Sequence, residues 1–172
     1  MHDRSVMPTP SSGILPWTQS CFVCGESNPH GLHLKSRLED GCVVLDFVPR
    51  AADFGWRHTV HGGITMALLD EVMTWASILT LHCACVAAEI TTRLKKPVLP
   101  DRKFRVEGRI VKANTRLVLA KGEIRDERNE LHALASGKYV AMPPDQFSCC
   151  EQDFVVGPDA IHPDQIFTKQ SV

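Results

Sequence analysis

The sequence lacks two features that would assign it quickly to a class of protein. It has no excess of basic residues, because 19 Lys and Arg stand against 20 Asp and Glu and give a formal net charge of -1. That balance removes the usual argument for a nucleic-acid binder. It also has no uninterrupted apolar run of membrane-spanning length, since the longest one, at residues 64–81, contains Asp70 and Glu71. We therefore expect neither a nucleic-acid partner nor a membrane partner.

A secretion signal and an even set of cysteines are lacking as well. Residues 1–17 are rich in Pro, Ser and Gly and hold no apolar run of the signal-peptide type. An odd number of cysteines without such a signal argues against a disulfide framework. We expect a cytoplasmic protein with reduced thiols. The seven cysteines are Cys21, Cys24, Cys42, Cys83, Cys85, Cys149 and Cys150.

What is present suits one globular domain. The chain has 172 residues, of which 44% are hydrophobic and 23% charged, and this size is enough to bury a core. We expect a flexible N-terminal arm at residues 1–17 and a folded domain at residues 18–143. Residues 144–172 show no clear periodicity, and no fold is assigned to this C-terminal tail.

The order of the elements predicts an α+β fold. Strand patterns at residues 32–38 and 42–48 precede a helix at residues 63–81, which is apolar on nearly every face and is therefore expected to be buried. Residues 49–60 read as irregular. Four further strands are expected at residues 87–94, 104–111, 117–125 and 131–142. The first of them begins at Ala87. An antiparallel sheet wrapped around a single helix accounts for this order.

The start of the helix carries the strongest functional signal. His61-Gly62-Gly63 leads into the helix and leaves backbone N–H donors aimed outward, with the positive end of the helix dipole behind them. Such donors can stabilise the oxyanion that forms during acyl transfer. Two turns further on, Asp70 interrupts an apolar helix, and a buried carboxylate needs a partner or a function. Glu71 is the competing carboxylate and points about 100° away around the helix.

The segment HGGITMALLDE, preceded by CFVCGESNPHGL and followed by ITTRLKKPVLP, resembles the hotdog-fold thioesterases related to phenylacetate-pathway enzymes. The resemblance implies a long central helix wrapped by an antiparallel sheet of about five to six strands. It also implies a homodimer, or a dimer of dimers (a homotetramer), with active sites at the dimer interface. In this family the Gly after the His supplies an oxyanion N–H, and an acidic residue eight positions later acts on water or on the thioester. These positions are Gly62 and Asp70, so the resemblance selects Asp70 over Glu71.

Other residues near this motif are assigned more general roles. His61 is expected to help position the substrate or to shape the start of the helix. Gly63 and His58 are further candidates for substrate contact. Ser77 and Thr74 lie on the helix where they can offer a hydroxyl to Asp70.

Two positions depart from the family pattern. Relatives often carry Asn six residues before the His, where this chain has Gly55. They also commonly carry Thr or Ser at the position of Ala87. Because the Asn side chain and the Thr or Ser hydroxyl are missing at these positions, the sequence does not determine how efficient catalysis is.

Basic residues follow the predicted strand at residues 87–94. The resemblance places Arg93, Lys95 and Lys96 near the phosphates of coenzyme A, which Lys and Arg bind as charged donors. The alternative is an ordinary solvated strand face.

Cys21 and Cys24 form a CxxC pair that could supply half of a zinc site. His30 and His33 complete a Cys2His2 set on paper, but no second ligand pair has finger spacing. We expect a packed loop, no metal and no cofactor.

The sequence thus predicts an acyl-CoA thioesterase in which Asp70, Gly62 and His61 form the catalytic group. The alternative is a dimeric acyl-CoA-binding module without turnover. A hotdog hydratase acting on enoyl-CoA is a third possibility, but no Asp and His pair has the spacing expected of hydratases.

Overall fold

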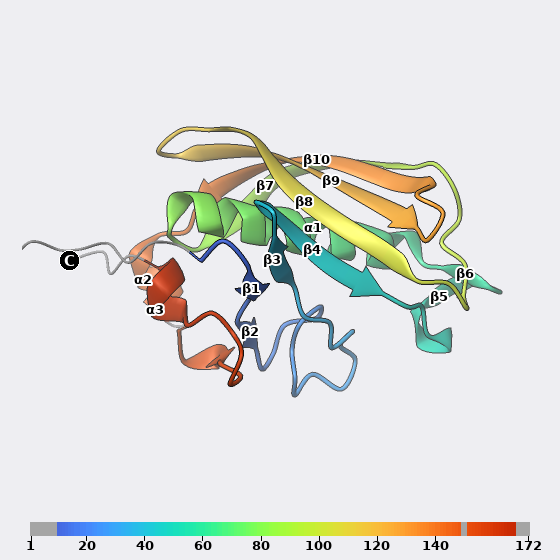
Figure 1. Cartoon of the computed structure of the whole chain (residues 1–172), viewed down its shortest axis with the longest axis horizontal. Coiled ribbons are helices and arrows are strands. Elements are labelled where there is room, and N and C mark those ends of the chain that lie inside the picture. The colour runs from blue at the N-terminus through green and yellow to red at the C-terminus, as the bar shows by residue number, and fades with distance from the viewer. Residues whose placement is uncertain (1–9, 149–150, 168–172) are drawn as a thin grey trace, which may run out of the picture.

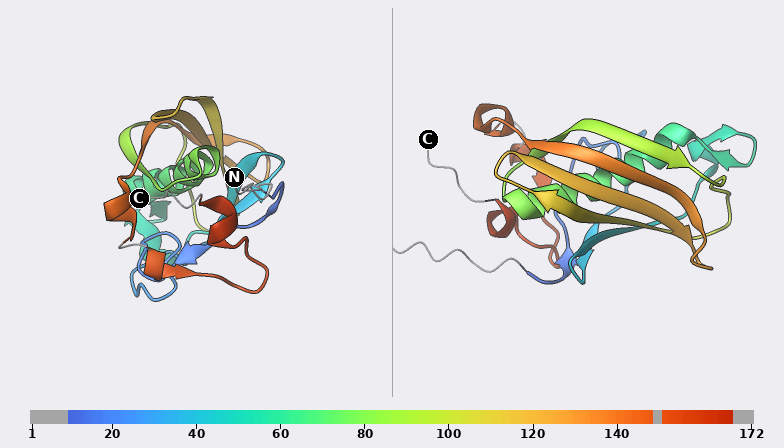
Figure 2. Two further views of the ribbon diagram at one scale, coloured as in Figure 1. Left: turned by 90° about the vertical axis from the view of Figure 1, so that its left-hand side faces the viewer. Right: turned by 90° about the horizontal axis from the view of Figure 1, so that it is seen from above.

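The computed structural model describes residues 10–148 and 151–167, and one long helix forms its centre. This helix, α1 (Gly62–Leu81), lies against a seven-stranded antiparallel sheet of order β1-β3-β4-β8-β9-β10-β7. Figure 1 shows the sheet above the helix, and Figure 2 shows it curving around the helix axis. The strands are β1 (Gly13–Ile14), β3 (Arg37–Glu39), β4 (Cys42–Phe47), β7 (Cys85–Leu94), β8 (Phe104–Ala113), β9 (Leu117–Asp126) and β10 (Leu131–Ala141). This is the expected α+β hotdog fold, with a wider sheet than the five to six strands predicted.

Helix α1 begins and ends at histidines. The His61 side chain accepts a hydrogen bond of 2.9 Å from the Gly63 N–H and so caps the N-terminus, while His82 ends the helix with a positive φ of 54°. By length and hydropathy alone the helix could span a membrane, but half of its most apolar window is buried inside the fold. Its apolar surface is covered by the sheet, as expected of a core helix.

The sheet presents one apolar and one charged face. Along β8, Phe104 and Val106 are fully buried against the helix. Arg105 and Arg109 point outward and form ion pairs with Glu39 of β3 and Glu123 of β9. Gly108 lies directly against the helix, since a Cβ there would come within 2.5 Å of the Val72 carbonyl oxygen. The alternation predicted for this strand is therefore confirmed, and a glycine sets the close approach of helix and sheet.

Two segments before the helix differ from the sequence prediction. Only Arg37–Glu39 of the strand expected at residues 32–38 pairs in the sheet. The segment at 49–60, expected to be irregular, contains the 3-10 helix η1 (Ala51–Asp53) and the short hairpin of β5 (Phe54–Trp56) and β6 (Thr59–Val60). These elements are short and depend on local side-chain contacts, such as the hydrogen bonds that the buried Asp53 carboxylate accepts from Arg50, so they leave no periodic pattern.

The segments on both sides of the domain pack beneath the helix. Strand β2 (Trp17–Thr18) pairs with β11 (Phe154–Val155), and β1 pairs with β3. Buried side chains from these segments include Leu15, Trp17, Ile161 and Ile166. The remaining elements are α2 (Pro144–Ser148), η2 (Glu151–Asp153) and α3 (Pro163–Ile166). The structure therefore differs from the boundaries expected at residues 17 and 143: residues 10–17 and much of 144–167 belong to the folded unit, and residues 1–9 lie outside the described part.

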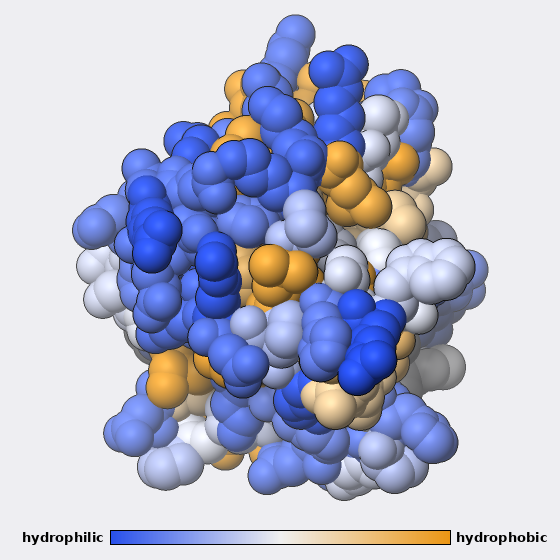
Figure 3. All heavy atoms as spheres, turned by 90° about the vertical axis from the view of Figure 1, so that its right-hand side faces the viewer, coloured by the Kyte–Doolittle hydropathy of each residue, from blue (hydrophilic) through white to orange (hydrophobic). Residues whose placement is uncertain are grey.

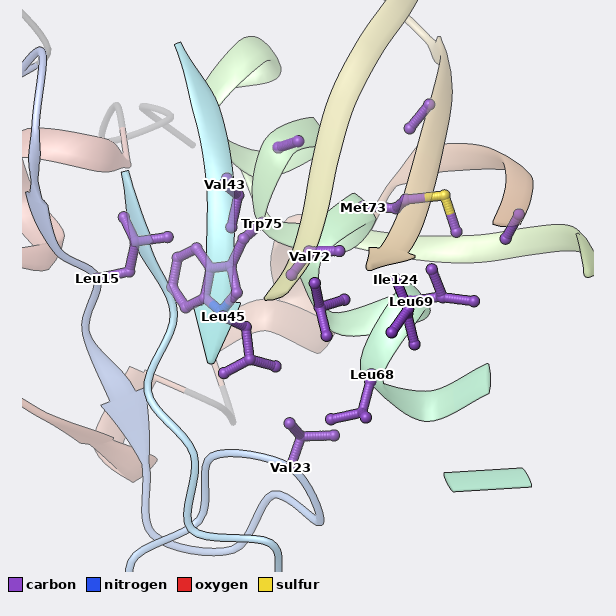
Figure 4. Packing of buried hydrophobic residues seen from close by; sticks show 14 of the residues in the cluster. Leu15, Val23, Val43, Leu45, Leu68, Leu69, Val72, Met73, Trp75 and Ile124 are labelled. Carbon is purple, nitrogen blue, oxygen red and sulfur yellow. The ribbon is translucent and has the colours of Figure 1, made fainter. Parts of the chain in front are cut away.

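The hydrophobic core has contributions from both layers. Leu68, Leu69, Val72, Met73 and Trp75 project from the helix. Figure 4 shows them between the sheet residues Val43, Leu45 and Ile124 and the N-terminal residues Leu15 and Val23. The helix is thus enclosed on both sides, and its polar residues must find partners inside the fold or at its edge.

Candidate active site

Asp70 is half-buried in the middle of α1 and is held by two hydroxyl groups. Tyr139 on β10 donates a hydrogen bond of 2.9 Å to Oδ1 of Asp70, and Thr74, one turn along the helix, donates one of 3.2 Å to the same oxygen. Oδ2 has no protein partner among the described residues. The carboxylate is therefore oriented through one oxygen and leaves the other available to a water molecule or substrate. Of the two helix hydroxyls considered from the sequence, Thr74 contacts Asp70, whereas Ser77 donates to the Met73 carbonyl.

Tyr139 was not found from the sequence. It is the only tyrosine of the chain and is fully buried, and burial, followed by the charge of Asp70, raises the pKa of its phenol. The ring lies over Gly137, where a Cβ would come within 2.5 Å of Cε2 of Tyr139. The sequence did contain a sign of this contact: a single tyrosine on the inward face of a predicted strand. A buried tyrosine hydroxyl needs a hydrogen-bond partner, and Asp70 could have been considered for that role.

The N-terminus of α1 offers one free donor. The N–H of Gly63 is taken by Nδ1 of His61, so this ring nitrogen carries no hydrogen and Nε2 carries it instead. The N–H of Gly62, the first of the helix, finds no acceptor among the described residues. The three residues therefore have different roles. Gly62 has the free N–H donor, whereas His61 caps the helix and accepts the hydrogen bond from the Gly63 N–H. His61 is also exposed.

Gly55 and His58 lie in the hairpin that precedes this motif. A Cβ at Gly55 would come within 2.9 Å of Cδ2 of His61, so the position that often holds Asn in relatives is closed by the capping ring. His58 is exposed in the turn, with a positive φ of 61° and its ring 6.4 Å from Phe54. In the described part of the chain, no hydrogen bond links His58 to the helix terminus.

Glu71 lies on another side of the helix from Asp70 and belongs to a different group. Oε1 of Glu71 accepts a hydrogen bond of 3.1 Å from the indole of Trp75, and its carboxylate lies within 4.8 Å of the sulfur atoms of Cys21 and Cys24. Burial, followed by the charge of Cys21, raises the pKa of Glu71 to about 8. The side-chain hydrogen bond between the two cysteines lowers the pKa of Cys21 to about 6 and raises that of Cys24. His30 and His33 are exposed and do not join this group.

The basic residues expected to bind phosphate lie at the same end of the molecule as Gly62. Leu94, at the end of β7, lies between Arg93 and Lys95 in the sequence and packs against Gly62. A Cβ on Gly62 would lie 3.0 Å from Cδ1 of Leu94. Arg93 and Lys95 are exposed and have no ion-pair partner among the described residues, whereas Lys96 pairs with Glu130. Figure 3 shows this end as mostly hydrophilic, with separate apolar areas. Two cations that flank Leu94 in the sequence are thus without an ion-pair partner in the described part of the chain.

Strand β7 forms an edge of the sheet. It pairs with β10 on one side only, and most of its residues are exposed. Val86 and Leu94 are apolar, with exposed fractions of 41% and 55%. Ala87 stands opposite Tyr139 in the β10–β7 register. An exposed ten-residue edge with apolar side chains is a surface suited to pairing with another strand.

The chain is similar to known proteins in sequence over part of its length and in its fold. Residues 58–133 match the family model described as the thioesterase superfamily. The chain is similar to the PaaI protein from the phenylacetic acid degradation operon of E. coli, with 19% identity over 61% of this chain and 75% of that chain, and a TM-score of 0.57. It is similar to a hypothetical thioesterase from Streptococcus pneumoniae solved with coenzyme A, with 16% identity over 60% and 82% of the two chains and a TM-score of 0.56. Comparison with curated protein sequences gives no match.

A third similar structure is an acyl-CoA hydrolase from Staphylococcus aureus in complex with butyryl coenzyme A. It is 20% identical over 61% of this chain and 65% of that chain, with a TM-score of 0.57. The fold shared with these structures is the hotdog fold. The sequence match to the thioesterase superfamily model runs from the turn before α1 into β10.

Proposed function

We propose that this protein hydrolyses an acyl-CoA thioester to a free acid and coenzyme A, with Asp70 as its catalytic carboxylate. The observation that carries the proposal is the pair of groups on α1: a carboxylate fixed through one oxygen and a helix N-terminal N–H without an acceptor. The similar structures that hold coenzyme A or butyryl coenzyme A support the choice of thioester.

The two groups belong to one site only if two chains combine. Asp70 lies eight residues after Gly62, which corresponds to about 12 Å along the helix axis. A thioester carbonyl must lie about 3 Å from its oxyanion donor and close to the attacking oxygen. One chain therefore does not bring its own Gly62 and Asp70 to the same carbonyl.

An antiparallel pairing of two β7 edges removes this separation. Gly62 contacts Leu94 at one end of β7, and Asp70 bonds to Tyr139, which stands opposite Ala87 near the other end. A two-fold axis near Ile90 and Thr91 would bring the Leu94 end of one strand to the Ala87 end of its partner. Each site would then combine Gly62 of one subunit with the partner subunit's Asp70. The assembly is a homodimer, which can pair again as a dimer of dimers.

The chemistry follows from these positions. In one route the free oxygen of Asp70 takes a proton from water as the water attacks the thioester carbonyl; the C–S bond of the tetrahedral intermediate then breaks, and the coenzyme A thiolate leaves and takes up that proton. In the other route Asp70 attacks the carbonyl itself and displaces the coenzyme A thiolate, and water then cleaves the resulting anhydride to the free acid and the Asp70 carboxylate. The Gly62 N–H and the positive end of α1 stabilise the oxyanion. Arg93 and Lys95 are exposed cations without an ion-pair partner among the described residues, and we propose that they hold the phosphates of coenzyme A.

The second candidate function is acyl-CoA binding without turnover. Ala87 favours it, because the residue opposite Tyr139 on β7 has no hydroxyl to act with Asp70. Thiol release from acyl-CoAs of short, long and aryl type distinguishes the two. We expect turnover by the wild type and a loss of about 10²–10⁴-fold in kcat for Asp70→Asn. Asp40→Asn, in an exposed turn, is the matched control and retains full activity. Wild-type protein that binds these thioesters without releasing thiol establishes the binding module instead.

The shared site is tested by mixing two inactive variants. Gly62→Pro removes the N–H donor at the first helical position, where proline is tolerated, and the extended conformation of His61 suits a following proline. Mixed with Asp70→Asn after exchange of subunits, half of the dimers are hybrids, and each hybrid has one intact site. About a quarter of wild-type activity is then expected, whereas a site within one chain gives no recovery.

A further inference from the structure

The strongest group outside the candidate active site joins the CxxC loop to helix α1. The sulfur atoms of Cys21 and Cys24 and a carboxylate oxygen of Glu71 all lie within 4.8 Å of one another. A tetrahedral zinc ion with bonds of about 2.1–2.3 Å holds such ligands roughly 3.5–3.8 Å apart. The three atoms are therefore close to ligand spacing and need to move inward only slightly.

The loop already has the shape of a metal-binding turn. The N–H groups of Val23 and Cys24 point at the Cys21 sulfur, at 3.2 and 3.5 Å, and so support a negative charge on it. The turn is closed by a bond of 2.9 Å from the Gly25 N–H to the Cys21 carbonyl oxygen. A Cβ at Gly25 would come within 2.1 Å of that oxygen, so only glycine fits after the second cysteine. Both sulfurs are thereby held on the side facing α1.

The group consists of acidic side chains alone. Two thiols and a carboxylate meet here, and no Lys, Arg or His side chain of the described residues pairs with any of them. The indole N–H of Trp75 donates a hydrogen bond to the Glu71 carboxylate and fixes the orientation of that carboxylate. Zinc binds the deprotonated forms of thiols and carboxyl groups and displaces their protons, so all three groups can act as ligands.

We propose that Cys21, Cys24 and Glu71 bind a divalent zinc ion, with water in the fourth position. The ion would fasten the N-terminal segment to helix α1 beside Asp70. It would act chiefly on stability, because Glu71 lies on a different side of the helix from the Asp70–Tyr139 pair. The expectation of no metal is revised, because the third ligand lies about 50 residues away on α1 and not at the spacing of His30 and His33.

The proposal is tested on the reduced full-length chain after treatment with a chelator. Cys149 and Cys150, which lie outside the described residues, are first replaced by Ser to remove their own affinity for metals. Cobalt titration is expected to give sulfur-to-metal charge-transfer bands that saturate at one ion per chain, and competition with a chromophoric chelator gives the zinc affinity. Zinc should also raise the Tm in proportion to the logarithm of its concentration.

Variants then assign the ligands. Cys21→Ser and Cys24→Ser should lose the cobalt bands, and Glu71→Gln, which keeps the shape of the side chain, should weaken zinc binding at least tenfold. Cys42→Ser changes a cysteine on β4 and should bind as the wild type does. Reduced protein without charge-transfer bands overturns the proposal whether or not the variants fold. It is also overturned if Cys21 and Cys24 form a disulfide and the reduced chain binds no metal, or if Cys42→Ser weakens binding as much as Cys21→Ser.

Discussion

Tyr139 and Asp70, which are 69 residues apart in the sequence, are joined by a hydrogen bond of 2.9 Å between the phenol and Oδ1. The phenol stays protonated over the working pH range because its pKa is raised by burial and by the charge of Asp70. It is therefore a permanent donor. Since Thr74 donates to the same oxygen, the orientation of the carboxylate depends on a strand and a helix at once.

Replacing Tyr139 by Phe should lower activity without unfolding the protein. The ring still fills its place in the core, but Asp70 loses a donor to its charged form and turns more freely. A hydrogen bond to a charged group contributes about 1.5–3 kcal/mol, so we expect kcat to fall about tenfold or more with little change in KM. Steady-state thiol release measures both. Thr74→Val should give a smaller loss, and a Tyr139→Phe enzyme with unchanged kcat refutes the positioning role.

Gly137→Ala should disturb the same pair from the opposite side. The added methyl group would lie 2.5 Å from Cε2 of Tyr139, so the ring must move or the strand must shift. Overpacking of this kind costs about 1–3 kcal/mol, measured as a lower free energy of unfolding in urea. Ser136→Ala, the exposed neighbour on the other face of β10, is the control and should change neither stability nor activity. Equal stability of the two variants contradicts the close contact.

Glu71 should make the metal-free protein less stable as the pH rises. In the folded state Glu71 keeps its proton up to a pKa of about 8, whereas the unfolded chain releases it near 4.5. Between these values the folded state binds more protons, so this contribution is present below about pH 4.5 and is lost as the pH rises towards 8. Glu71→Gln lacks this loss.

The comparison of the two proteins isolates the effect. The difference in unfolding free energy between Glu71→Gln and wild type should grow from pH 5 to 8, by up to about 1.4 kcal/mol for each pH unit, and then level off. Chemical denaturation with chelator and reductant present gives this difference. Glu127→Gln, in the exposed turn between β9 and β10, serves as control and should follow the wild type. Parallel curves for Glu71→Gln and wild type would show that Glu71 is charged in the folded protein.

Charge introduced on β7 should separate the subunits. Ala88→Glu places a second acidic residue beside Glu89 near the proposed two-fold axis, and like charges across an interface cost several kcal/mol. Analytical ultracentrifugation should then show a monomer, and activity should disappear with the dimer. Val111→Glu alters an exposed apolar residue on β8 and should leave both unchanged. A fully active monomeric Ala88→Glu protein would contradict the shared site.

The central elements could be predicted from the sequence because their patterns are long. The apolar run of α1 and the alternation in β8 extend over enough residues to identify a helix and a strand. Strands such as β1, β2 and β11 have only two residues each, and they exist because distant segments cover the helix. Their burial depends on tertiary packing and produces no local period.

The same distinction between local and tertiary contacts applies to the candidate site. Asp70 and Gly62 could be proposed because both lie within one helical motif, and the use of the Gly63 N–H by His61 requires only a local cap. Tyr139 and the grouping of Glu71 with Cys21 and Cys24 could not, because their partners come from other elements. Sequence spacing describes neighbours on one helix, whereas these contacts are made across the fold.

The closure beneath α1 by two distant segments affects how the protein folds during synthesis. Phe154 of β11 covers Trp75 with a ring contact of 6.5 Å, and β11 pairs with β2. At roughly 5–20 residues per second, a ribosome needs on the order of 4–15 seconds to extend the chain from the end of α1 to β11. During that interval β8, β9 and β10 can pair as local hairpins, but one side of the helix stays uncovered. In a nascent chain, this side of α1 is therefore exposed to solvent until residues 154–167 are available to cover it.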